Sequence, residues 1–272
     1  MPFYILKPEN AEKPPLILAL HGHGSNGKSA VCGIDKGDQR LADAIRLLNY
    51  AYGVQLVKQG FMVLCPDARG FGERAEKTKQ NDESLLDSSC YILNDMANPL
   101  GMNVTGMWTW DLMRLLDYAL TRNDFDHEKI NSAGLSGGGL QTLWLAAIDE
   151  RINNAIISGY FYGYRQSLLE MYNCSCNYIP GLWENADMCD IAALIANRGV
   201  FIETGDTDPL NGADGLGNVY PQVEIVKQAA KICGNENNIV HYVFSGGHRW
   251  NGEKSVPWIK NKNLQEKVNE NR

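Results

Sequence analysis

Short apolar runs alternate with longer amphipathic segments along most of this chain. The apolar runs lie at residues 16–20, 61–65, 130–135, 155–158, 200–203 and 240–244. The segments with helical spacing lie near residues 41–58, 108–120, 140–148 and 223–232. Such alternation is typical of a parallel sheet flanked by helices, because a crossover must precede each new parallel strand. We therefore expect an α/β fold with a mostly parallel central sheet and helices on both faces.

The length and composition of the chain favour one folded domain. It has 272 residues, of which 44% are hydrophobic and 21% charged, close to the averages of globular proteins. An α/β domain of this size buries a substantial core. The polar segment 73–104 is long enough for an active-site loop, and no linker or repeat divides the chain. We predict a single domain over residues 1–272.

The charge balance excludes several kinds of partner. The formal net charge is −7, and no block of Lys and Arg offers a surface to nucleic acid or an anionic membrane. No apolar run is long enough to cross a bilayer, and the first residues lack the pattern of a signal peptide, although one could have been removed.

Seven cysteines cannot all pair in one chain, which favours a reducing, cytoplasmic location. A homo-oligomer is compatible with these features.

Two pairs of side chains invite a metal-binding interpretation. Cys174 and Cys176 have one residue between them, whereas a zinc knuckle has two, and no histidine is near them in the sequence. His21 and His23 could reach one ion, but no third ligand lies nearby in the chain. We therefore expect neither a metal nor another cofactor.

The segment Gly134-Leu135-Ser136-Gly137-Gly138 is the strongest catalytic motif. It follows an apolar strand and precedes an apolar helix, and its glycines stand where a sharp strand-to-helix turn would crowd side chains. Such a turn presents the serine hydroxyl at the end of the sheet. A serine attacks poorly unless a base takes its proton, so Ser136 predicts a nucleophile with a base nearby.

The base is sought among five histidines. In folds that present a serine on such a turn, the base follows the nucleophile in sequence, which leaves His241 and His248. His241 lies inside an apolar strand pattern, where a packed histidine is expected. His248 follows that strand in a glycine-containing turn at the carboxyl end of the sheet, where ligands bind. We predict His248 as the base.

The imidazole needs an acceptor for its other nitrogen, and a carboxylate also stabilises the imidazolium. The loop after the strand at 200–203 offers Glu203, Asp206 and Asp208. Glu203 is still in the strand, so we discount it. Both aspartates are suitably placed, and the one that does not contact the histidine would cap a turn or bind backbone.

The oxyanion that forms during attack on a carbonyl needs preorganised donors. Backbone N–H groups supply them when the nucleophile sits on a strand-to-helix turn. One donor is expected at Gly137, the residue after the nucleophile. The other is expected in the loop after the first strand, at His23.

Five motifs in this order resemble the α/β-hydrolase superfamily over most of the chain. They are His21-Gly-x-Gly, Pro66-Asp-x-Arg-Gly-x-Gly, Gly-Leu-Ser136-Gly-Gly, Gly205-x-x-Asp208 and Gly246-Gly-His248. Within the superfamily the chain is similar to the dienelactone-hydrolase-like and acetyl xylan esterase-like branch. The resemblance implies an α/β-hydrolase fold, a catalytic set of Ser136, Asp208 and His248, and an oxyanion hole at His23 and Gly137.

The chain departs from this pattern at two informative places. Dienelactone hydrolases proper use a cysteine nucleophile, whereas position 136 is serine. Glucuronoyl esterases carry an arginine directly after the nucleophile, whereas position 137 is glycine. The resemblance therefore argues against dienelactone and glucuronoyl esters as substrates.

We expect a serine carboxylesterase that works through an acyl-enzyme, on acetyl-like or on carbohydrate or aromatic esters. A large inserted lid is absent, which favours short acyl groups. The aromatic segment 160–164, with Trp183 and Trp250, would either line the substrate pocket or fill the core. The alternatives are a peptidase like prolyl oligopeptidase, which usually carries a propeller domain absent here, and a noncatalytic binding protein of the same fold.

Overall fold

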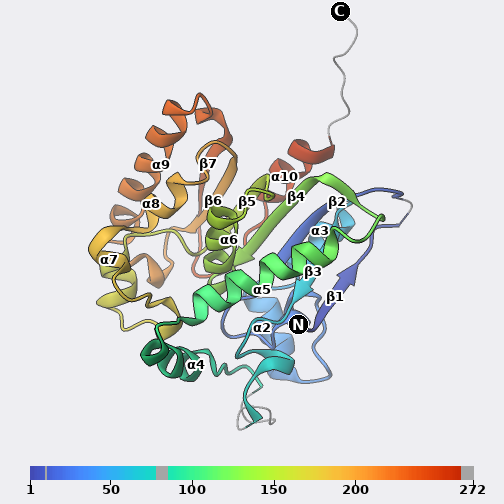
Figure 1. Ribbon diagram of the computed structural model, residues 1–272, viewed down its shortest axis with the longest axis horizontal. Helices are drawn as coiled ribbons and strands as arrows, with labels where there is room; N and C mark the ends of the chain where they lie inside the picture. Colours follow the sequence, from blue (N-terminus) through green and yellow to red (C-terminus); the bar gives the residue numbers. More distant parts are fainter. Residues whose placement is uncertain (10, 78–84, 265–272) are drawn as a thin grey trace, which may run out of the picture.

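A seven-stranded sheet runs through the middle of the molecule (Figure 1). The computed structural model describes residues 1–9, 11–77 and 85–264. The strands are β1 (Phe3–Leu6), β2 (Pro15–Leu20), β3 (Met62–Pro66), β4 (Asp126–Leu135), β5 (Asn154–Ser158), β6 (Gly199–Gly205) and β7 (Ile239–Phe244). Their order is β1-β3-β2-β4-β5-β6-β7. Of the strands in the described residues, β1 alone is antiparallel to its neighbour. The predicted α/β-hydrolase fold, with its mostly parallel sheet, is confirmed.

The strand β1 was not among the predicted strands. It has four residues, none of them fully buried, and it pairs with β3 alone. An edge strand of this length carries no long apolar run, so the sequence offers little periodicity to detect. The strands at the centre, by contrast, are buried on both faces, and β2, β3 and β5 have no exposed residue.

The helices cover the two faces of the sheet. They are α1 (Lys28–Val31), α2 (Gln39–Leu47), α3 (Tyr52–Lys58), α4 (Cys90–Ala97), α5 (Val104–Ala119), α6 (Gly137–Ile148), α7 (Leu182–Asn185), α8 (Met188–Ala193), α9 (Tyr220–Ile232) and α10 (Ser255–Leu264). One face packs against α5, α6, α8 and α9, and the other against α1, α2, α3 and α10 (Figure 1). No helix in the described parts of the chain is both long enough and apolar enough to span a membrane.

Two predicted segments differ from the structure. The helix expected over 41–58 is two helices, α2 and α3, because Asn49 adopts a left-handed conformation with φ 52° and turns the chain between them. The segment 73–104, expected to be irregular, contains α4. Residues 78–84 of that segment lie outside the described residues.

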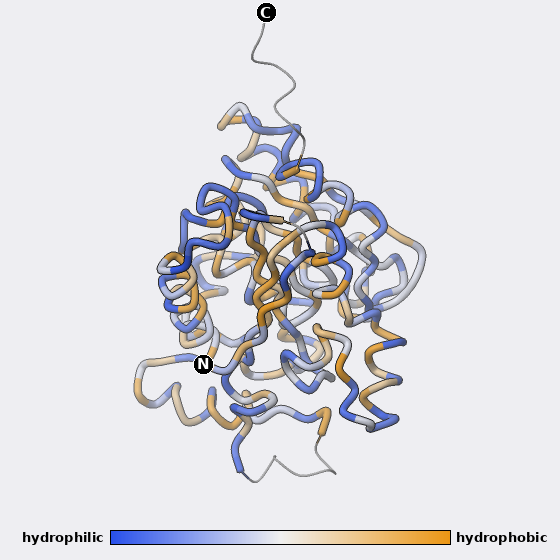
Figure 2. Tube along the Cα trace, turned by 90° about the vertical axis from the view of Figure 1, so that its right-hand side faces the viewer, coloured by the Kyte–Doolittle hydropathy of each residue, from blue (hydrophilic) through white to orange (hydrophobic). Residues whose placement is uncertain are grey.

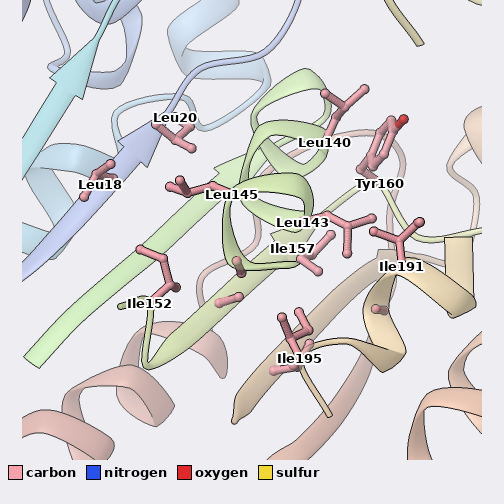
Figure 3. Close-up of a cluster of buried hydrophobic side chains, with 14 of the residues drawn as sticks. Leu18, Leu20, Leu140, Leu143, Leu145, Ile152, Ile157, Tyr160, Ile191 and Ile195 are labelled. Atoms are coloured by element: carbon pink, nitrogen blue, oxygen red, sulfur yellow. The ribbon is translucent and has the colours of Figure 1, made fainter. Parts of the chain in front are cut away.

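The helix α6, which begins directly after Ser136, is mostly buried. Nine of its twelve residues are buried. Leu140, Leu143 and Leu145 point into a hydrophobic cluster that also contains Leu20 of β2 and Ile157 of β5 (Figure 3). Burial of a leucine side chain contributes about 1.5–3 kcal/mol to the stability of the fold, so these three side chains hold α6 against the sheet. Figure 2 shows the same pattern on a larger scale, since the hydrophobic segments gather in the centre.

The parallel arrangement determines where a site can form. The strands β2, β4, β5, β6 and β7 all run in one direction, so their carboxyl ends share one edge of the sheet. The loops that follow them carry His23, Ser136, Asp208 and His248. Residues far apart in the chain are thereby brought to one edge.

Candidate active site

Ser136 stands on the sharp turn between β4 and α6. Its backbone has φ 59° and ψ −121°, a combination that non-glycine residues rarely adopt. Such a residue costs about 1–3 kcal/mol and persists only where the surroundings enforce it. Here the N–H of Ser136 donates to the carbonyl of Ser158 at 2.8 Å, and its carbonyl accepts from the N–H of Leu140 at 3.0 Å. The strain lifts the serine side chain out of the strand and leaves it partly exposed.

The glycines around Ser136 are required by close backbone contacts. A Cβ on Gly138 would lie 1.8 Å from the carbonyl oxygen of Leu20. A Cβ on Gly134 would lie 2.3 Å from the backbone of Gly138. The turn therefore presses directly on β2 and on itself, and no larger residue fits at either position.

His248 and Asp208 form a hydrogen-bonded pair. Nδ1 of His248 lies 2.7 Å from Oδ2 of Asp208. The Asp208 side chain is only 1% exposed, whereas that of His248 is 22% exposed. The second carboxylate oxygen, Oδ1, accepts from the N–H of Leu210 at 2.9 Å. Each carboxylate oxygen of Asp208 thus has a hydrogen-bond partner. The contact with Nδ1 orients the imidazole ring of His248, and Nε2 makes no contact with Asp208.

Asp206 has a different partner. Its Oδ1 accepts from the N–H of Gly246 at 2.8 Å, which closes the loop that leads to His248. The two aspartates left open by the loop pattern therefore divide the two roles expected there. Asp208 contacts the histidine, and Asp206 binds backbone.

Glu203 has a supporting position that the sequence did not reveal. It lies at the carboxyl end of β6, is completely buried, and accepts from the N–H groups of Asn251 and Gly252 and from Ser255 Oγ. Asn251 and Gly252 lie in the segment between His248 and α10, and Ser255 is the first residue of that helix. Burial raises the pKa of Glu203, although these hydrogen bonds oppose the shift. A carboxylate inside an otherwise apolar strand was the signal available, since such a group needs partners.

Ser136 and His248 both lie against the Ser158–Gly159 backbone. The carbonyl of Ser158 accepts from Ser136, and a Cβ on Gly159 would lie 3.0 Å from Cε1 of His248. Among the described residues, no hydrogen bond joins Ser136 Oγ to His248 Nε2. Catalytic hydrogen bonds are often long or poorly aligned before substrate binds, and they tighten in the complex.

The expected oxyanion donors lie beside the serine. A Cβ on Gly22 would lie 2.9 Å from the backbone N of Gly137 and 3.0 Å from Cβ of Ser136, so the loop after β2 touches the nucleophile turn. No hydrogen bond within the described chain uses the backbone N–H of His23 or of Gly137. The carbonyl of His23 accepts from the hydroxyl of Tyr50 at 2.6 Å, which holds this loop from behind.

The side chain of His23 faces three cysteines. Its Nε2 lies 3.3 Å from Cys90 Sγ and 3.4 Å from Cys176 Sγ, and Cys174 Sγ lies 3.5 Å from Cys90 Sγ. Burial lowers the pKa of His23, but the hydrogen bonds and charges of Cys174 and Cys90 outweigh burial and raise it to about 10. No histidine is near Cys174 and Cys176 in the sequence, but the fold brings His23 and Cys90 to them across long stretches of chain.

His21 takes no part in this group. Its Nε2 accepts from the N–H of Ala68 at 3.0 Å, and its Nδ1 lies 3.2 Å from the carbonyl of Gly22. Burial lowers the pKa of His21, which keeps the ring neutral. It joins the loop after β2 to the loop after β3. The two histidines considered as a zinc pair thus point to different surroundings.

His241, the other histidine that follows Ser136, is a packed residue of β7. Its Nε2 lies 3.0 Å from Thr204 Oγ1, and its ring packs edge-on against Tyr220. Burial and the neighbouring Lys227 lower the pKa of His241 to about 4. The ring is therefore neutral at pH 7 and lies inside the sheet, whereas His248 lies beyond the carboxyl end of β7.

The aromatic segment 160–164 fills the core. Tyr160, Phe161, Tyr162 and Tyr164 are at most 6% exposed, and Trp250 is fully buried against Tyr52. These rings offer no open face for a sugar.

Two arginines considered as clamps for a substrate carboxylate are engaged in ion pairs. Arg69 binds both oxygens of Asp111 at 2.8 and 2.9 Å, and Arg165 pairs with Glu170 on the surface. Both are structural partners of nearby acids.

The comparisons with known proteins concern the family and the fold. The model of the Abhydrolase family matches residues 1–245. The chain belongs to the Abhydrolase family. A relative, Putative hydrolase YtaP of Bacillus subtilis (strain 168), is 28% identical to this chain over 240 residues, which cover 85% of this chain and 74% of that protein. This abhydrolase family member therefore shares most of its length with a chain named as a hydrolase.

Solved structures share the fold of this abhydrolase family member. A putative acetyl xylan esterase from Bacteroides fragilis superposes with a TM-score of 0.72 at 22% identity, over 89% of this chain. This chain spans 62% of that protein's length. A putative dienelactone hydrolase from Klebsiella pneumoniae superposes with a TM-score of 0.53 at 18% identity, over 95% of this chain and 84% of its own. At these identities the likeness shows the fold.

Proposed function

We propose that the protein is a serine carboxylesterase with Ser136 as nucleophile, His248 as general base and Asp208 as the acid that orients it. The observation that carries the proposal is the pairing of a strained serine turn with a partly buried His248–Asp208 hydrogen bond at the same edge of the sheet. Membership of a hydrolase family and the likeness of fold to esterases support it.

The proposed reaction is a two-step acyl transfer. Ser136 Oγ attacks the ester carbonyl while Nε2 of His248 takes its proton, and the bond to the alcohol breaks as the imidazolium returns that proton to the leaving oxygen. Water then attacks the acyl-enzyme, with His248 again taking a proton, and the acid is released. The N–H groups of His23 and Gly137 donate to the oxyanion in both steps.

Asp208 stabilises the imidazolium in this scheme. Its carboxylate is buried and accepts from Nδ1, so it favours the tautomer with the proton on Nδ1 and the lone pair on Nε2. No step requires a cofactor.

We propose short acyl esters, such as acetyl esters, as the substrate class. No inserted lid domain appears among the described helices, whose bounds fit the common sheet-and-helix arrangement. The buried aromatic segment 160–164 lends no support to stacking of a sugar or aromatic ester there. Of the rings considered for such a pocket, only Trp183 is substantially exposed, at 47%.

Labelling with a fluorophosphonate probe and hydrolysis of p-nitrophenyl acetate test the proposal. We expect wild type to label at Ser136 and to hydrolyse the ester, and Ser136→Ala to do neither. His248→Ala is expected to lose most of the activity, whereas His241→Ala, the matched control, keeps it. A wild-type protein that neither labels nor hydrolyses would refute the enzyme, and labelling of Ser136→Ala would refute the nucleophile.

A further inference from the structure

Four soft or borderline metal-ligating atoms converge beside the proposed active site. They belong to His23, Cys90, Cys174 and Cys176, which we call the Cys3His cluster, and they all lie within 4.8 Å of one another. They come from three separate segments: the loop after β2, the first residue of α4, and the short 3-10 helix Ser175–Asn177 with its N-cap. Two of the cysteines are buried, and His23 and Cys174 are partly exposed.

The distances within the Cys3His cluster approach those of a tetrahedral metal site. Zinc binds sulfur at about 2.3 Å and nitrogen at about 2.0–2.1 Å, so ligand atoms at the corners of a tetrahedron lie about 3.5–3.8 Å apart. The corresponding contacts here are 3.3 Å from Cys90 Sγ to His23 Nε2, 3.4 Å from Cys176 Sγ to the same nitrogen, and 3.5 Å between the sulfurs of Cys90 and Cys174. Small side-chain adjustments would complete the tetrahedron.

We propose that His23 Nε2 and the sulfurs of Cys90, Cys174 and Cys176 bind one structural Zn²⁺ ion. Thiolates with one imidazole are a ligand set that selects Zn²⁺ among the abundant divalent ions, and four protein ligands make a closed, structural site. Binding requires three thiolates and a neutral His23 imidazole, so the protons that these four side chains hold at the ligand atoms pass to solvent, and the complex of Zn²⁺ with three thiolates carries one negative charge. A disulfide would use only two of the four groups.

The surroundings of the Cys3His cluster hold its ligands in place. Asn177 Nδ2 donates to the carbonyl of Cys174 at 2.9 Å and to Cys176 Sγ at 3.6 Å. Thr105 of α5 donates to the carbonyl of Cys176, and Asn94 of α4 donates to that of Ser175. Polar donors that fix the ligand backbone and reach a sulfur are the second layer expected around a metal–thiolate site.

The ion would fasten the oxyanion loop, a consequence that rests on the proposed function. The other ring nitrogen of His23, Nδ1, lies against Gly137, where an added Cβ would be 3.0 Å away. The His23 ring therefore lies between the cysteines and the nucleophile turn. A metal that holds this ring would also hold the backbone N–H of His23 that we propose as an oxyanion donor.

Metal analysis of the intact protein tests the site without reference to activity. Protein expressed with added zinc and purified untagged under reducing conditions is analysed by mass spectrometry of its elements, and we expect about one Zn²⁺ per chain. Apoprotein titrated with Co²⁺ is expected to develop thiolate-to-cobalt charge-transfer bands and the intense visible bands of a tetrahedral ion.

The variants separate the Cys3His cluster from other thiols. Cys174→Ser, at a partly exposed position, is expected to lose the zinc and the cobalt bands, while Cys189→Ser and Cys233→Ser keep both. Circular dichroism checks that each variant is folded, and if Cys174→Ser does not fold, the cobalt titration of wild type decides. The inference is overturned if reduced wild type takes up neither ion, if it takes up Co²⁺ without charge-transfer bands, or if Cys189→Ser loses as much metal as Cys174→Ser.

Two further measurements keep this inference apart from the proposed function. Ser136→Ala is expected to retain the zinc, because the metal site does not use the nucleophile. If wild type binds zinc but hydrolyses no ester, the proposed function alone is refuted. If wild type hydrolyses the ester but takes up no metal, the metal site alone is refuted. If the ion fastens the oxyanion loop, its removal lowers kcat by at least about tenfold with little change in KM, since oxyanion contacts form in the transition state. An unchanged kcat after zinc removal would refute the coupling to the loop.

Discussion

Replacement of Asp208 by asparagine removes one charge and hardly changes the shape of the side chain. The surroundings dictate how the new amide must lie. The N–H of Leu210 donates to Oδ1 at 2.9 Å. The amide oxygen of the asparagine must therefore take the place of Oδ1, because its NH₂ group there would face the N–H of Leu210, donor against donor. The NH₂ group then faces Nδ1 of His248, where the carboxylate oxygen lay at 2.7 Å.

This orientation reverses the histidine tautomer. An NH₂ donor forces Nδ1 to accept, so the proton moves to Nε2, the nitrogen that should take the proton of Ser136. Because Asp208 is 1% exposed, water cannot readily replace the lost acceptor. A wrong tautomer of this kind lowers kcat by about 10⁴-fold in a serine protease, or about 5.5 kcal/mol. We expect a loss of the same order for Asp208→Asn.

Asp206→Asn is the matched control. Its Oδ1 accepts from the N–H of Gly246, and an asparagine oxygen can still do so. We expect its kcat for p-nitrophenyl acetate to stay within about tenfold of wild type, a difference below about 1.4 kcal/mol. Both variants should unfold in urea with midpoints close to that of wild type.

The assignment of the acid fails if Asp208→Asn keeps kcat within tenfold of wild type. It also fails if Asp206→Asn loses more activity than Asp208→Asn while both remain folded. Either result would mean that the 2.7 Å contact with His248 does not orient the base.

Three other predictions concern stability. Gly138→Ala places a Cβ 1.8 Å from the carbonyl oxygen of Leu20, so we expect the free energy of unfolding in urea to fall by about 3 kcal/mol or more. Gly217→Ala, whose Cβ has room, is the control and should change it little. Equal unfolding midpoints for the two variants would refute this reasoning. The Tyr162 hydroxyl is buried without a partner in the described chain, so Tyr162→Phe should leave the melting temperature unchanged or raise it. Burial raises the pKa of Asp111, but its ion pairs with Arg69 and Arg74 outweigh burial and lower it. The ionised Asp111 therefore stabilises the folded protein above the unfolded pKa of about 3.9, and this stabilisation is lost as the pH falls through the folded pKa. The difference in unfolding free energy between wild type and Asp111→Asn, about 1.5–3 kcal/mol at pH 7, should shrink from about pH 5 towards pH 3, and a difference that grows on acidification would contradict the ion pair.

The predictable part of the fold was the part with repeated local signals. The buried parallel strands and the helix α6 are long apolar segments, so their pattern appears in the sequence whatever surrounds them. The short edge strand β1 was missed because four residues are too few to show a strand period, and the helix α10 was missed because a proline, lysines and asparagines interrupt its apolar residues. The break between α2 and α3 was missed because it depends on one asparagine with positive φ.

The candidate site divides along the same line. Ser136 and His248 could be proposed from their positions after a strand, since a parallel sheet places strand ends together. The choice between Asp206 and Asp208 depended on which carboxylate faces the imidazole, and loop conformation decides that. The prediction that the whole chain forms one domain, and those about location and oligomeric state, stay predictions.

The sequence by itself determined the succession of the buried parallel strands, the family resemblance and the glycine-flanked serine turn, because each strand and each motif is a local pattern and the motifs follow one another in a recognisable order along the chain. Only the tertiary structure decided that Asp208 meets His248 and that His23 meets three cysteines. Cys90 and Cys174 are 84 residues apart, and His23 and Cys176 are 153 apart. No spacing rule links groups at such separations, since they become neighbours only when the strands and helices between them pack.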